Sequence, residues 1–350
     1  MKIYRTGAVL LVFLLLLTGC GSGGDSSGGG SGGSTQASNT EAEGLLPGPG
    51  GRTQESKGVS TVYVAMDGWD SAETVSIIEA EHRGFFEKAD LAVITLSPVT
   101  SKLTIPDVVK GQDSIGVAHG PEAIEALDRG APIVIIGNVL ERSTAAFIWD
   151  KTSGISGIAD LKGKTVAIPG LAFQEAFLEK ALEEEGLSPS EVKVISVGND
   201  LVPALVKGRA DAIFGGSENV EGIDLKARGF EPVVTPVGEF GVPDYDELVL
   251  VARRDIAEAN PELMSDFVSA TAHGASEAAK NPQEAAAALA ATGESNPEIS
   301  PRTKQVQVRA TLGELSASGE VDPARLQGLI DWMYENEMIE AEHSAQELLP

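Results

Sequence analysis

The sequence has almost no cysteine, few aromatic residues and a small share of basic side chains. Cys20 is the only cysteine among 350 residues, so the chain cannot form an internal disulfide and must be stabilised by packing. Its formal net charge is −26, and no cluster of Lys or Arg is evident. This balance argues against nucleic acid as a partner and gives no electrostatic attraction to anionic lipid. No apolar run approaches the length that spans a membrane.

The N-terminus carries an export signal. Lys2 and Arg5 precede an apolar stretch over 8–17, which is too short to cross a bilayer. Because Cys20 closes the run Leu17-Thr18-Gly19-Cys20, the segment resembles a bacterial lipoprotein signal in which Cys20 becomes the lipidated first residue. The alternative is a plain secretory signal with an incidental cysteine. We therefore expect a signal peptide at 1–19 and a protein held on the extracytoplasmic face of the cell membrane by acyl chains, such as palmitate, on Cys20.

A linker is expected at 20–59. This segment is rich in Gly, Ser and Thr, then in Pro and Gly, and has too little apolar content to order itself. A flexible coil of this length reaches roughly 35 Å. It suits a tether that lets the folded part move near the membrane, and it suits equally well a spacer with no length requirement.

Strands alternate with helices from residue 60 onward. β-Branched runs predict buried strands, and apolar residues at helical spacing predict the helices between them. In the first set we expect strands at 60–66, 91–96, 114–118 and 132–137, with helices at 73–88, 101–110 and 121–128. Such alternation predicts crossover connections and a mostly parallel sheet.

The pattern restarts after Leu140. In this second set we expect strands at 145–149, 165–168, 192–197, 210–214 and 232–235, with helices at 173–184, 202–207 and 220–228. A strand at 245–252 follows, and the rest is helical, with starts at Asn260-Pro261 and Asn281-Pro282 and a last helix at 325–337. The prediction is an α/β fold of two lobes that share a cleft: 60–142 with 247–345, and 143–246.

Motifs for enzyme chemistry are absent from the sequence. Gly157-x5-Gly163-Lys164-Thr165 is similar to a phosphate-binding loop, but the spacing is one residue too long and the following residues predict a strand rather than a helix. His82, His119, His273 and His343 are scattered, and no second cysteine exists to support a metal site. We therefore expect a protein that is not an enzyme, with no catalytic residues, no metal and no cofactor.

Several segments resemble one known family. These are Asp67-Gly68-Trp69, Arg83-Gly84-Phe85-Phe86, Gly116-Val117-Ala118-His119-Gly120, Asp160-Leu161-Lys162-Gly163-Lys164, Gly208-Arg209-Ala210-Asp211-Ala212, Asn219-Val220-Glu221-Gly222-Ile223 and Tyr245-Asp246-Glu247-Leu248-Val249. Over about 61–338 the chain is similar to the type II periplasmic solute-binding proteins of ABC importers, in the branch that binds pyrimidine precursors of thiamine. The resemblance implies a periplasmic-binding-protein type II fold.

Two departures from that family matter. The branch often carries an aromatic pair just before the Asn-x-Glu motif, whereas this chain has Ser217 and Glu218 there. Its eukaryotic pyrimidine-synthase members have a cysteine cluster, which this chain lacks. The second departure argues against synthase activity.

The candidate ligand-binding residues follow strand ends, because ligands of open α/β sheets bind at the carboxyl ends of the strands. They are Asp67, Trp69, Glu73, His119, Gly170, Phe173, Glu218, Glu221 and Tyr245. Trp69 is expected to stack on a ring or to cap the core, and His119 to contact ligand or to be a hydrogen-bonded loop residue. Glu221 is expected to bind ligand or only to favour its helix dipole.

The acidic character of these loops favours a cationic or amine-bearing ligand, since none of them has the Lys or Arg that sulfonate would need. The resemblance thus implies a monomeric solute-binding protein that delivers an aminopyrimidine thiamine precursor to an ABC permease with its ATPase. Another nitrogenous heterocycle or an alkanesulfonate is the alternative ligand. A ligand sensor that signals to a receptor is the alternative role.

Overall fold

The computed structural model describes residues 53–56, 58–98 and 100–350. The expected signal peptide, Cys20 and the linker up to residue 52 lie outside the described residues. Within the described ranges, none of the helices combines the length and the apolar character needed to cross a membrane.

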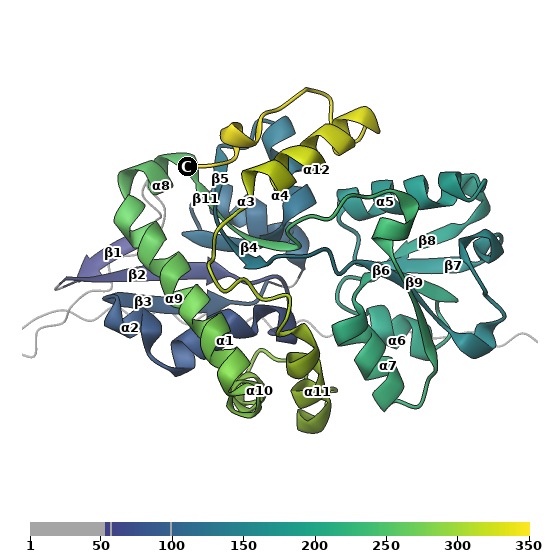
Figure 1. The fold of residues 1–350 in the computed structure, drawn as a ribbon, viewed down its shortest axis with the longest axis horizontal. Coiled ribbons are helices and arrows are strands. Elements are labelled where there is room, and N and C mark those ends of the chain that lie inside the picture. The colour runs from purple at the N-terminus through teal and green to yellow at the C-terminus, as the bar shows by residue number, and fades with distance from the viewer. Residues whose placement is uncertain (1–52, 57, 99) are drawn as a thin grey trace, which may run out of the picture. The chain divides into compact units, whose positions relative to one another are not determined.

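Two β-sheets organise the described part of the chain (Figure 1). The first contains β1 (Thr53–Ser56), β2 (Val59–Ala65), β3 (Leu91–Leu96), β4 (Ile115–His119), β11 (Leu248–Arg253) and β5 (Ile133–Leu140). The second contains β10 (Pro232–Pro236), β6 (Ala146–Asp150), β9 (Ala212–Gly216), β7 (Thr165–Ile168) and β8 (Lys193–Ser196), in that spatial order. We call the first sheet with the helices packed on it the first lobe, and the second sheet with its helices the second lobe.

Both sheets are mixed, which corrects the expectation of mostly parallel sheets. β2 pairs in parallel with β3 and β4, and β7 pairs in parallel with β8 and β9. β11 is antiparallel to both β4 and β5, and β6 is antiparallel to both β9 and β10. The reason is topological: β6 and β11 are the strands by which the chain enters each lobe from the other, so they run against their neighbours.

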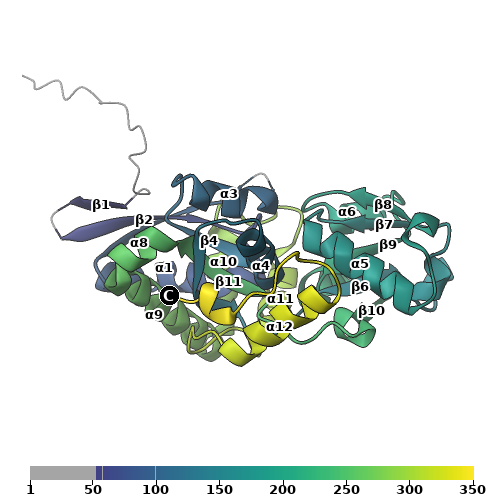
Figure 2. The same ribbon diagram turned by 90° about the horizontal axis from the view of Figure 1, so that it is seen from above.

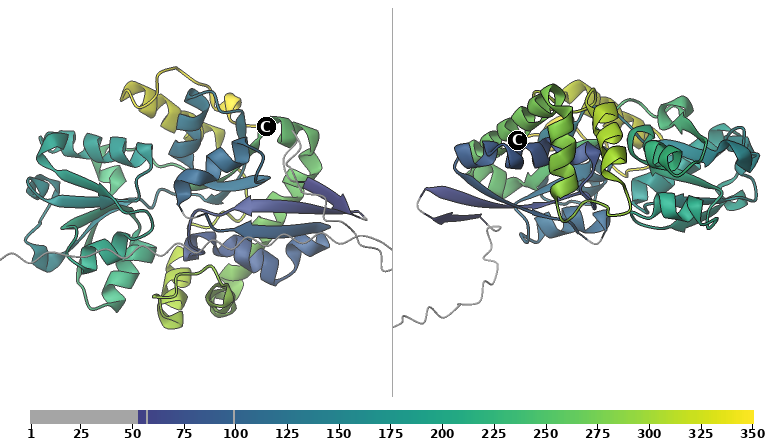
Figure 3. Two further views of the ribbon diagram at one scale, coloured as in Figure 1. Left: turned by 180° about the vertical axis from the view of Figure 1, so that it is seen from behind. Right: turned by 90° about the horizontal axis from the view of Figure 1, so that it is seen from below.

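The helices cover both faces of each sheet (Figures 1 and 2). They are α1 (Val75–His82), α2 (Phe85–Lys88), α3 (Thr104–Val109), α4 (Gly120–Asp128), α5 (Ala172–Glu184), α6 (Leu201–Val206), α7 (Ile223–Ala227), α8 (Arg254–Ala259), α9 (Pro261–Lys280), α10 (Pro282–Ala291), α11 (Pro301–Thr311) and α12 (Pro323–Glu335). Helices α10 and α11 pack against each other, and Figure 3 shows this yellow-green pair in two further views.

Most buried apolar side chains of the described residues belong to three clusters. One lies between the first sheet and α1, α9 and α10, and another lies between the second sheet and α6 and α7. The third begins under α3, α4 and α12 in the first lobe and continues to α5 in the second. At their boundary the ring of Trp332 meets the ring of Phe177 edge-on, at 5.4 Å between centroids. The apolar core is therefore continuous between the lobes on this side.

Two expected elements differ in detail. The segment expected as one helix at 73–88 is a 3₁₀ turn at Ala72–Thr74 followed by α1 and α2, because Gly84 adopts a left-handed conformation (φ 65°) that ends α1. The end of the expected linker is not disordered, since Thr53–Ser56 forms β1 and pairs antiparallel with β2. Backbone hydrogen bonds to an existing strand order this segment without any apolar pattern of its own.

Candidate functional site

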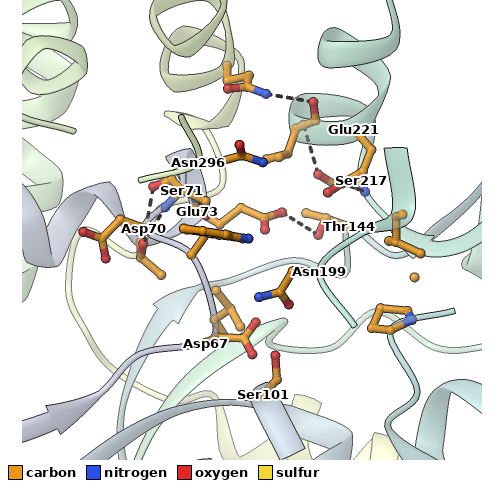
Figure 4. Close-up of a pocket in the computed structure, with 18 of the residues that line it drawn as sticks. Asp67, Asp70, Ser71, Glu73, Ser101, Thr144, Asn199, Ser217, Glu221 and Asn296 are labelled. Carbon is orange, nitrogen blue, oxygen red and sulfur yellow. Dashed lines mark hydrogen bonds between the residues drawn. The ribbon is translucent and has the colours of Figure 1, made fainter. Parts of the chain in front are cut away.

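A cavity lies at the carboxyl ends of β2, β4, β7 and β9, where the two lobes meet. Its volume is about 140 Å³, and it is partly open to solvent. Polar residues from both lobes line it: Asp67, Asp70, Ser71, Glu73, Thr74, Ser101, His119, Thr144, Gln174, Asn199, Ser217, Glu221, Glu247, Asn296, Lys304 and Gln307. Figure 4 labels several of them, including Asp67, Glu73, Asn199 and Glu221. The location is the crevice in which open α/β sheets bind ligands.

His119, at the end of β4, is held between two carboxylates. Its Nε2 lies 3.2 Å from Oδ2 of Asp67, and its Nδ1 lies 2.9 Å from Oε1 of Glu247. Burial alone would lower the pKa of the imidazole, but Asp67 and Glu247 raise it well above its usual value of 6.5. His119 is therefore a cation that donates hydrogen bonds to both carboxyl groups. Burial alone would raise the pKa of Asp67, but His119 outweighs this effect, and the pKa of Asp67 is lowered.

Glu247 also ties together the two crossings between the lobes. Its Oε2 accepts hydrogen bonds from the backbone N–H groups of Thr144 (2.8 Å) and Ala145 (3.3 Å), which lie on the first crossing. Glu247 itself lies on the second crossing, one residue before β11. A buried carboxylate with three donors is well satisfied. Glu247 therefore fixes the base of the cavity, and it was not among the residues predicted to form the site.

Glu73 enters the cavity from the 3₁₀ turn that precedes α1. Ser71 caps this turn by accepting the N–H of Glu73 at 3.2 Å, and Thr144 Oγ1 donates to Glu73 Oε1 at 3.2 Å. Burial raises the pKa of Glu73 to about 8, with further contributions from Glu221 and Glu247. At neutral pH this side chain is mainly a protonated carboxyl, which both donates and accepts a hydrogen bond.

Glu221 faces the cavity from the second lobe, on a single π-helical turn (Glu218–Gly222) after β9. Its Oε2 accepts the backbone N–H of Ser217 at 2.8 Å. Burial raises the pKa of Glu221 to about 6, although the Ser217 hydrogen bond lowers it. A side chain at Gly216 would place its Cβ 2.9 Å from Cγ of Glu221, so glycine there makes room for this carboxylate. Near pH 7 it is mainly ionised.

The lobes approach closely at the Asp67-Gly68-Trp69 segment. Gly68 has φ 72°, and a Cβ at this position would lie 2.6 Å from Nδ2 of Asn199 in the second lobe. Glycine is favoured by the left-handed backbone, and a Cβ there would also force the Asn199 side chain to shift. The next residue, Trp69, lines the cavity and keeps 41% of its surface exposed, so its ring is available to a ligand rather than buried in the core.

Of the residues predicted from the sequence, Asp67, Trp69, Glu73, His119 and Glu221 line the cavity together. Four others do not. Phe173 and Tyr245 are 1% exposed and pack on either side of Phe177, because an aromatic ring after a strand end is more stable in the core. The exposed Glu218 pairs with Lys226 (3.6 Å), and Gly170 is buried beside Ser196 rather than open to the cavity.

The sequence analysis missed one wall of the cavity. Asn296, Ile299, Lys304 and Gln307 come from α11 and the segment before it, more than 70 residues after Glu221. Only their place in the helical C-terminal region was predictable, and no strand end marks them. Lys304 adds to the cavity a basic side chain that the loops after the strands do not supply.

Hydrogen bonds between α11 or its neighbours and the second lobe close this side of the cavity. Asn219 Nδ2 donates to Glu314 Oε2 at 2.7 Å, and Gln307 Nε2 donates to the carbonyl of Val220 at 2.9 Å. Both bonds lie between residues of different lobes. Asn219 itself is not in the cavity lining, so it connects the lobes instead of facing a ligand.

The cavity has the chemistry of a binding site for a small polar molecule with amine or ring-nitrogen groups. Five carboxyl groups line it (Asp67, Asp70, Glu73, Glu221 and Glu247), against two basic groups (His119 and Lys304). Among the described residues, no group of three metal-ligating side chains is arranged to hold an ion.

A family model described as "NMT1/THI5 like" matches residues 71–285, which include most of the cavity lining. The chain belongs to the NMT1/THI5-like family. A Haemophilus influenzae relative assigned to thiamine biosynthesis is 27% identical and covers 79% of this chain and 88% of its own. The formylaminopyrimidine-binding protein of Halalkalibacterium halodurans is 28% identical and covers 66% of this chain and 70% of its own. Other family relatives are named 4-amino-5-hydroxymethyl-2-methylpyrimidine phosphate synthases.

The fold of the family member described here is that of the periplasmic binding proteins. The solved alkanesulfonate-binding protein of Xanthomonas axonopodis pv. citri superposes with a TM-score of 0.66 over 83% of this chain and 98% of its own, at 15% identity. At that identity the likeness establishes the two-lobed α/β fold with its helical C-terminal region, and not the ligand.

Proposed function

We propose that this protein is the solute-binding component of an ABC importer and captures a small nitrogenous heterocycle, with an aminopyrimidine precursor of thiamine favoured. The observation that carries the proposal is the convergence of Glu73 and Glu221 from opposite lobes on one cavity, beside the exposed ring of Trp69. The formylaminopyrimidine-binding relative supports the same ligand class.

The two glutamates suit an aminopyrimidine because they are in different protonation states at neutral pH. Glu221 is mainly a carboxylate, which accepts hydrogen bonds from an exocyclic amine or a protonated ring nitrogen. Glu73 is mainly a neutral carboxyl, which donates to an unprotonated ring nitrogen while its carbonyl oxygen accepts. Trp69 supplies a flat apolar surface on which a ring stacks. An alkanesulfonate has none of these donors and would face five carboxyl groups.

Capture would proceed by rotation of two rigid lobes. We propose that residues 60–142 with 247–345 form one body and 143–246 the other, and that they rotate about the crossings joined by Glu247. The hydrogen bonds from Asn219 and Gln307 then belong to the closed form. Lipid attachment at Cys20, with the segment to residue 52 as tether, would keep the protein at the outer face of the membrane beside its permease.

Relatives named as synthases make an enzyme the second candidate. The single Cys20 cannot provide the cysteine cluster of the synthase members, and it lies far along the chain from the cavity residues. We therefore propose a binder, whose ligand is released unchanged.

The deciding experiment is mass spectrometry of small molecules released by denaturing the purified protein, followed by calorimetric titration. We expect an aminopyrimidine among the released molecules, and saturable binding of 4-amino-5-hydroxymethyl-2-methylpyrimidine or its formylamino analogue. Ethanesulfonate, which has no amine, serves as the sulfonate control and should not bind. Recovery of a sulfonate, or chemical conversion of the pyrimidine by the protein, would contradict the proposal.

A further inference from the structure

Lys304 is a buried lysine in the wall of the cavity. It lies in the first turn of α11, and only 6% of its surface is exposed. Lysine is almost never buried to this degree without a carboxylate partner, because burial of an isolated ammonium is costly. No carboxylate oxygen of the described residues lies within 4.0 Å of the Lys304 ammonium, which distinguishes it from the paired lysines at the surface.

The hydrogen bonds of Lys304 are incomplete. Its Nζ donates to Oγ of Ser295 at 2.8 Å, the one hydrogen bond that the described part of the chain offers it. An ammonium has three N–H donors, so two have no acceptor there. Burial lowers the pKa of the Lys304 ammonium, and the charge of Asp70 offsets this only in part. The second observation is position: Lys304, Asp70 and Asn296 line the same cavity as the two glutamates.

We propose that Lys304 is a specificity-determining residue that donates a hydrogen bond to an uncharged oxygen substituent of the bound heterocycle, such as a hydroxyl or carbonyl group. This proposal rests on the proposed function, because it concerns the same ligand. The amine end of that ligand meets Glu73 and Glu221, and its oxygen substituent meets Lys304. Asn296, whose Oδ1 already accepts the N–H of Glu298 at 2.9 Å, keeps its amide N–H groups for the same substituent.

The acceptor is a neutral oxygen rather than a phosphate. Lys304 adds one positive charge to a cavity whose other basic group, His119, is held by Asp67 and Glu247. Asp70 is buried in the same cavity lining, and burial raises its pKa. Whenever Asp70 is ionised, its negative charge repels an anion bound next to Lys304. A phosphate dianion would therefore meet more negative than positive charge, whereas a hydroxyl or carbonyl oxygen gains a charge-assisted hydrogen bond without that repulsion.

The test compares matched probes on the full-length chain by calorimetric titration. The probes are 4-amino-5-hydroxymethyl-2-methylpyrimidine, its analogue with a methyl group in place of the hydroxymethyl group, and the phosphate ester of the first. We expect wild type to bind the hydroxymethyl compound about 10- to 100-fold more tightly than the methyl analogue. We expect it to bind the phosphate ester more weakly than the hydroxymethyl compound.

Lys304→Met keeps the apolar stem and removes the donors. It should lower affinity for the hydroxymethyl compound to that for the methyl analogue and leave the latter within about twofold. Lys193→Met, at an exposed lysine of β8, is the control and should change neither affinity. The melting temperature of ligand-free Lys304→Met should be equal to or above that of wild type, since an unpaired buried charge is removed.

The contrary outcomes are distinct. If both pyrimidines bind wild type equally, or if Lys304→Met weakens both by the same factor, Lys304 has only a structural role and the assignment is overturned while the proposed function stands. If the phosphate ester binds most tightly and depends on Lys304, the site is an anion site and the assignment is likewise wrong. If neither pyrimidine binds wild type, the proposed function and the assignment fail together.

Discussion

The side-chain amide of Asn219 in the second lobe donates a 2.7 Å hydrogen bond to the carboxylate of Glu314 in the first lobe. Asn219 belongs to the Asn219-Val220-Glu221 segment, in which Glu221 faces the cavity. Neighbouring residues of one turn therefore serve two purposes: one contacts the ligand space, and the other connects the lobes around it.

The Asn219–Glu314 bond should raise affinity without touching the ligand. Asn219→Ala is expected to weaken binding of every ligand by the same factor, about 3- to 10-fold, because it destabilises the closed form that binds. Titration with two pyrimidines measures this. Asn336→Ala, which removes a hydrogen bond to the Trp332 carbonyl at the C-terminal end of α12, is the control and should leave both affinities unchanged. A change in the ratio of the two affinities would show that Asn219 contacts ligand.

Glu221 should act on the ligand and not on stability. Glu221→Gln keeps the shape but replaces a charged acceptor by an amide, so affinity for an aminopyrimidine should fall about 10- to 100-fold. The melting temperature of the ligand-free protein should barely move. Calorimetry beside a melting curve on this variant checks both. A lower melting temperature with unchanged affinity would assign Glu221 to support of its turn alone.

Ligand-free protein should lose stability as the pH rises. The pKa values of Glu73 (about 8) and Glu221 (about 6) are raised in the folded state from an ordinary value of 4.5. A carboxyl group whose pKa is higher in the folded state stabilises the fold fully when the pH is below its pKa in the unfolded state. This stabilisation is lost as the pH rises through its pKa in the folded state. The melting temperature should therefore fall by roughly 5 °C between pH 5 and pH 8.5.

Glu73→Gln is the test of that assignment, because glutamine has no titrating proton. The variant should show a flatter pH dependence above pH 6, measured by thermal melts in a series of buffers at constant ionic strength. A profile identical to that of wild type would mean that Glu73 does not titrate in this range.

Gly68 should be required for closure of the lobes. Gly68→Ala places a Cβ 2.6 Å from Asn199 Nδ2, on a backbone with φ 72°. We expect about 1 kcal/mol of destabilisation from the backbone and, in addition, about a tenfold loss of affinity. Gly130→Ala is the matched control: Gly130 has φ 79° but nothing within 4 Å of the added Cβ. It should lose similar stability and no affinity. Equal affinity in both variants would contradict the steric argument.

Cys20 should determine membrane attachment. Cys20→Ser is expected to move most of the protein out of the membrane fraction, as uncleaved precursor or as released soluble protein, because serine cannot form the thioether of the lipid anchor. Fractionation with immunoblotting measures the shift, and mass spectrometry of the wild-type N-terminus identifies acyl chains. Wild-type protein without acyl groups and free in the medium would disprove the anchor.

Local patterns predicted most of the strands and helices, and they predicted the cavity residues that directly follow strands. Asp67, His119 and Glu221 were found because polar residues after a buried run must lie at a sheet edge. Phe173 and Tyr245, predicted by the same reasoning, are buried and not in the cavity lining, since an aromatic ring in such a position can pack into the core.

What could not be predicted depends on long-range pairing. Glu247 gains its role from contact with His119 and Thr144, which lie over 100 residues earlier. Lys304 and Asn296 reach the cavity only because α10 and α11 pack back on α1 and its neighbours. The spacing of residues in the sequence does not predict these contacts. It does not predict the antiparallel direction of β6 and β11 either, because that direction depends on how the chain passes between the lobes.

The position of β11 between β4 and β5 bears on the order in which the protein folds. β5 ends at Leu140, yet its partner strand begins only at Leu248. During synthesis or export, the first sheet thus lacks its central strand until the whole second sheet has been made. The second sheet, β6 to β10, is contiguous in the chain and needs no later strand. Its pairing can be completed first, and insertion of β11 is the long-range, slow step that ends assembly of the first.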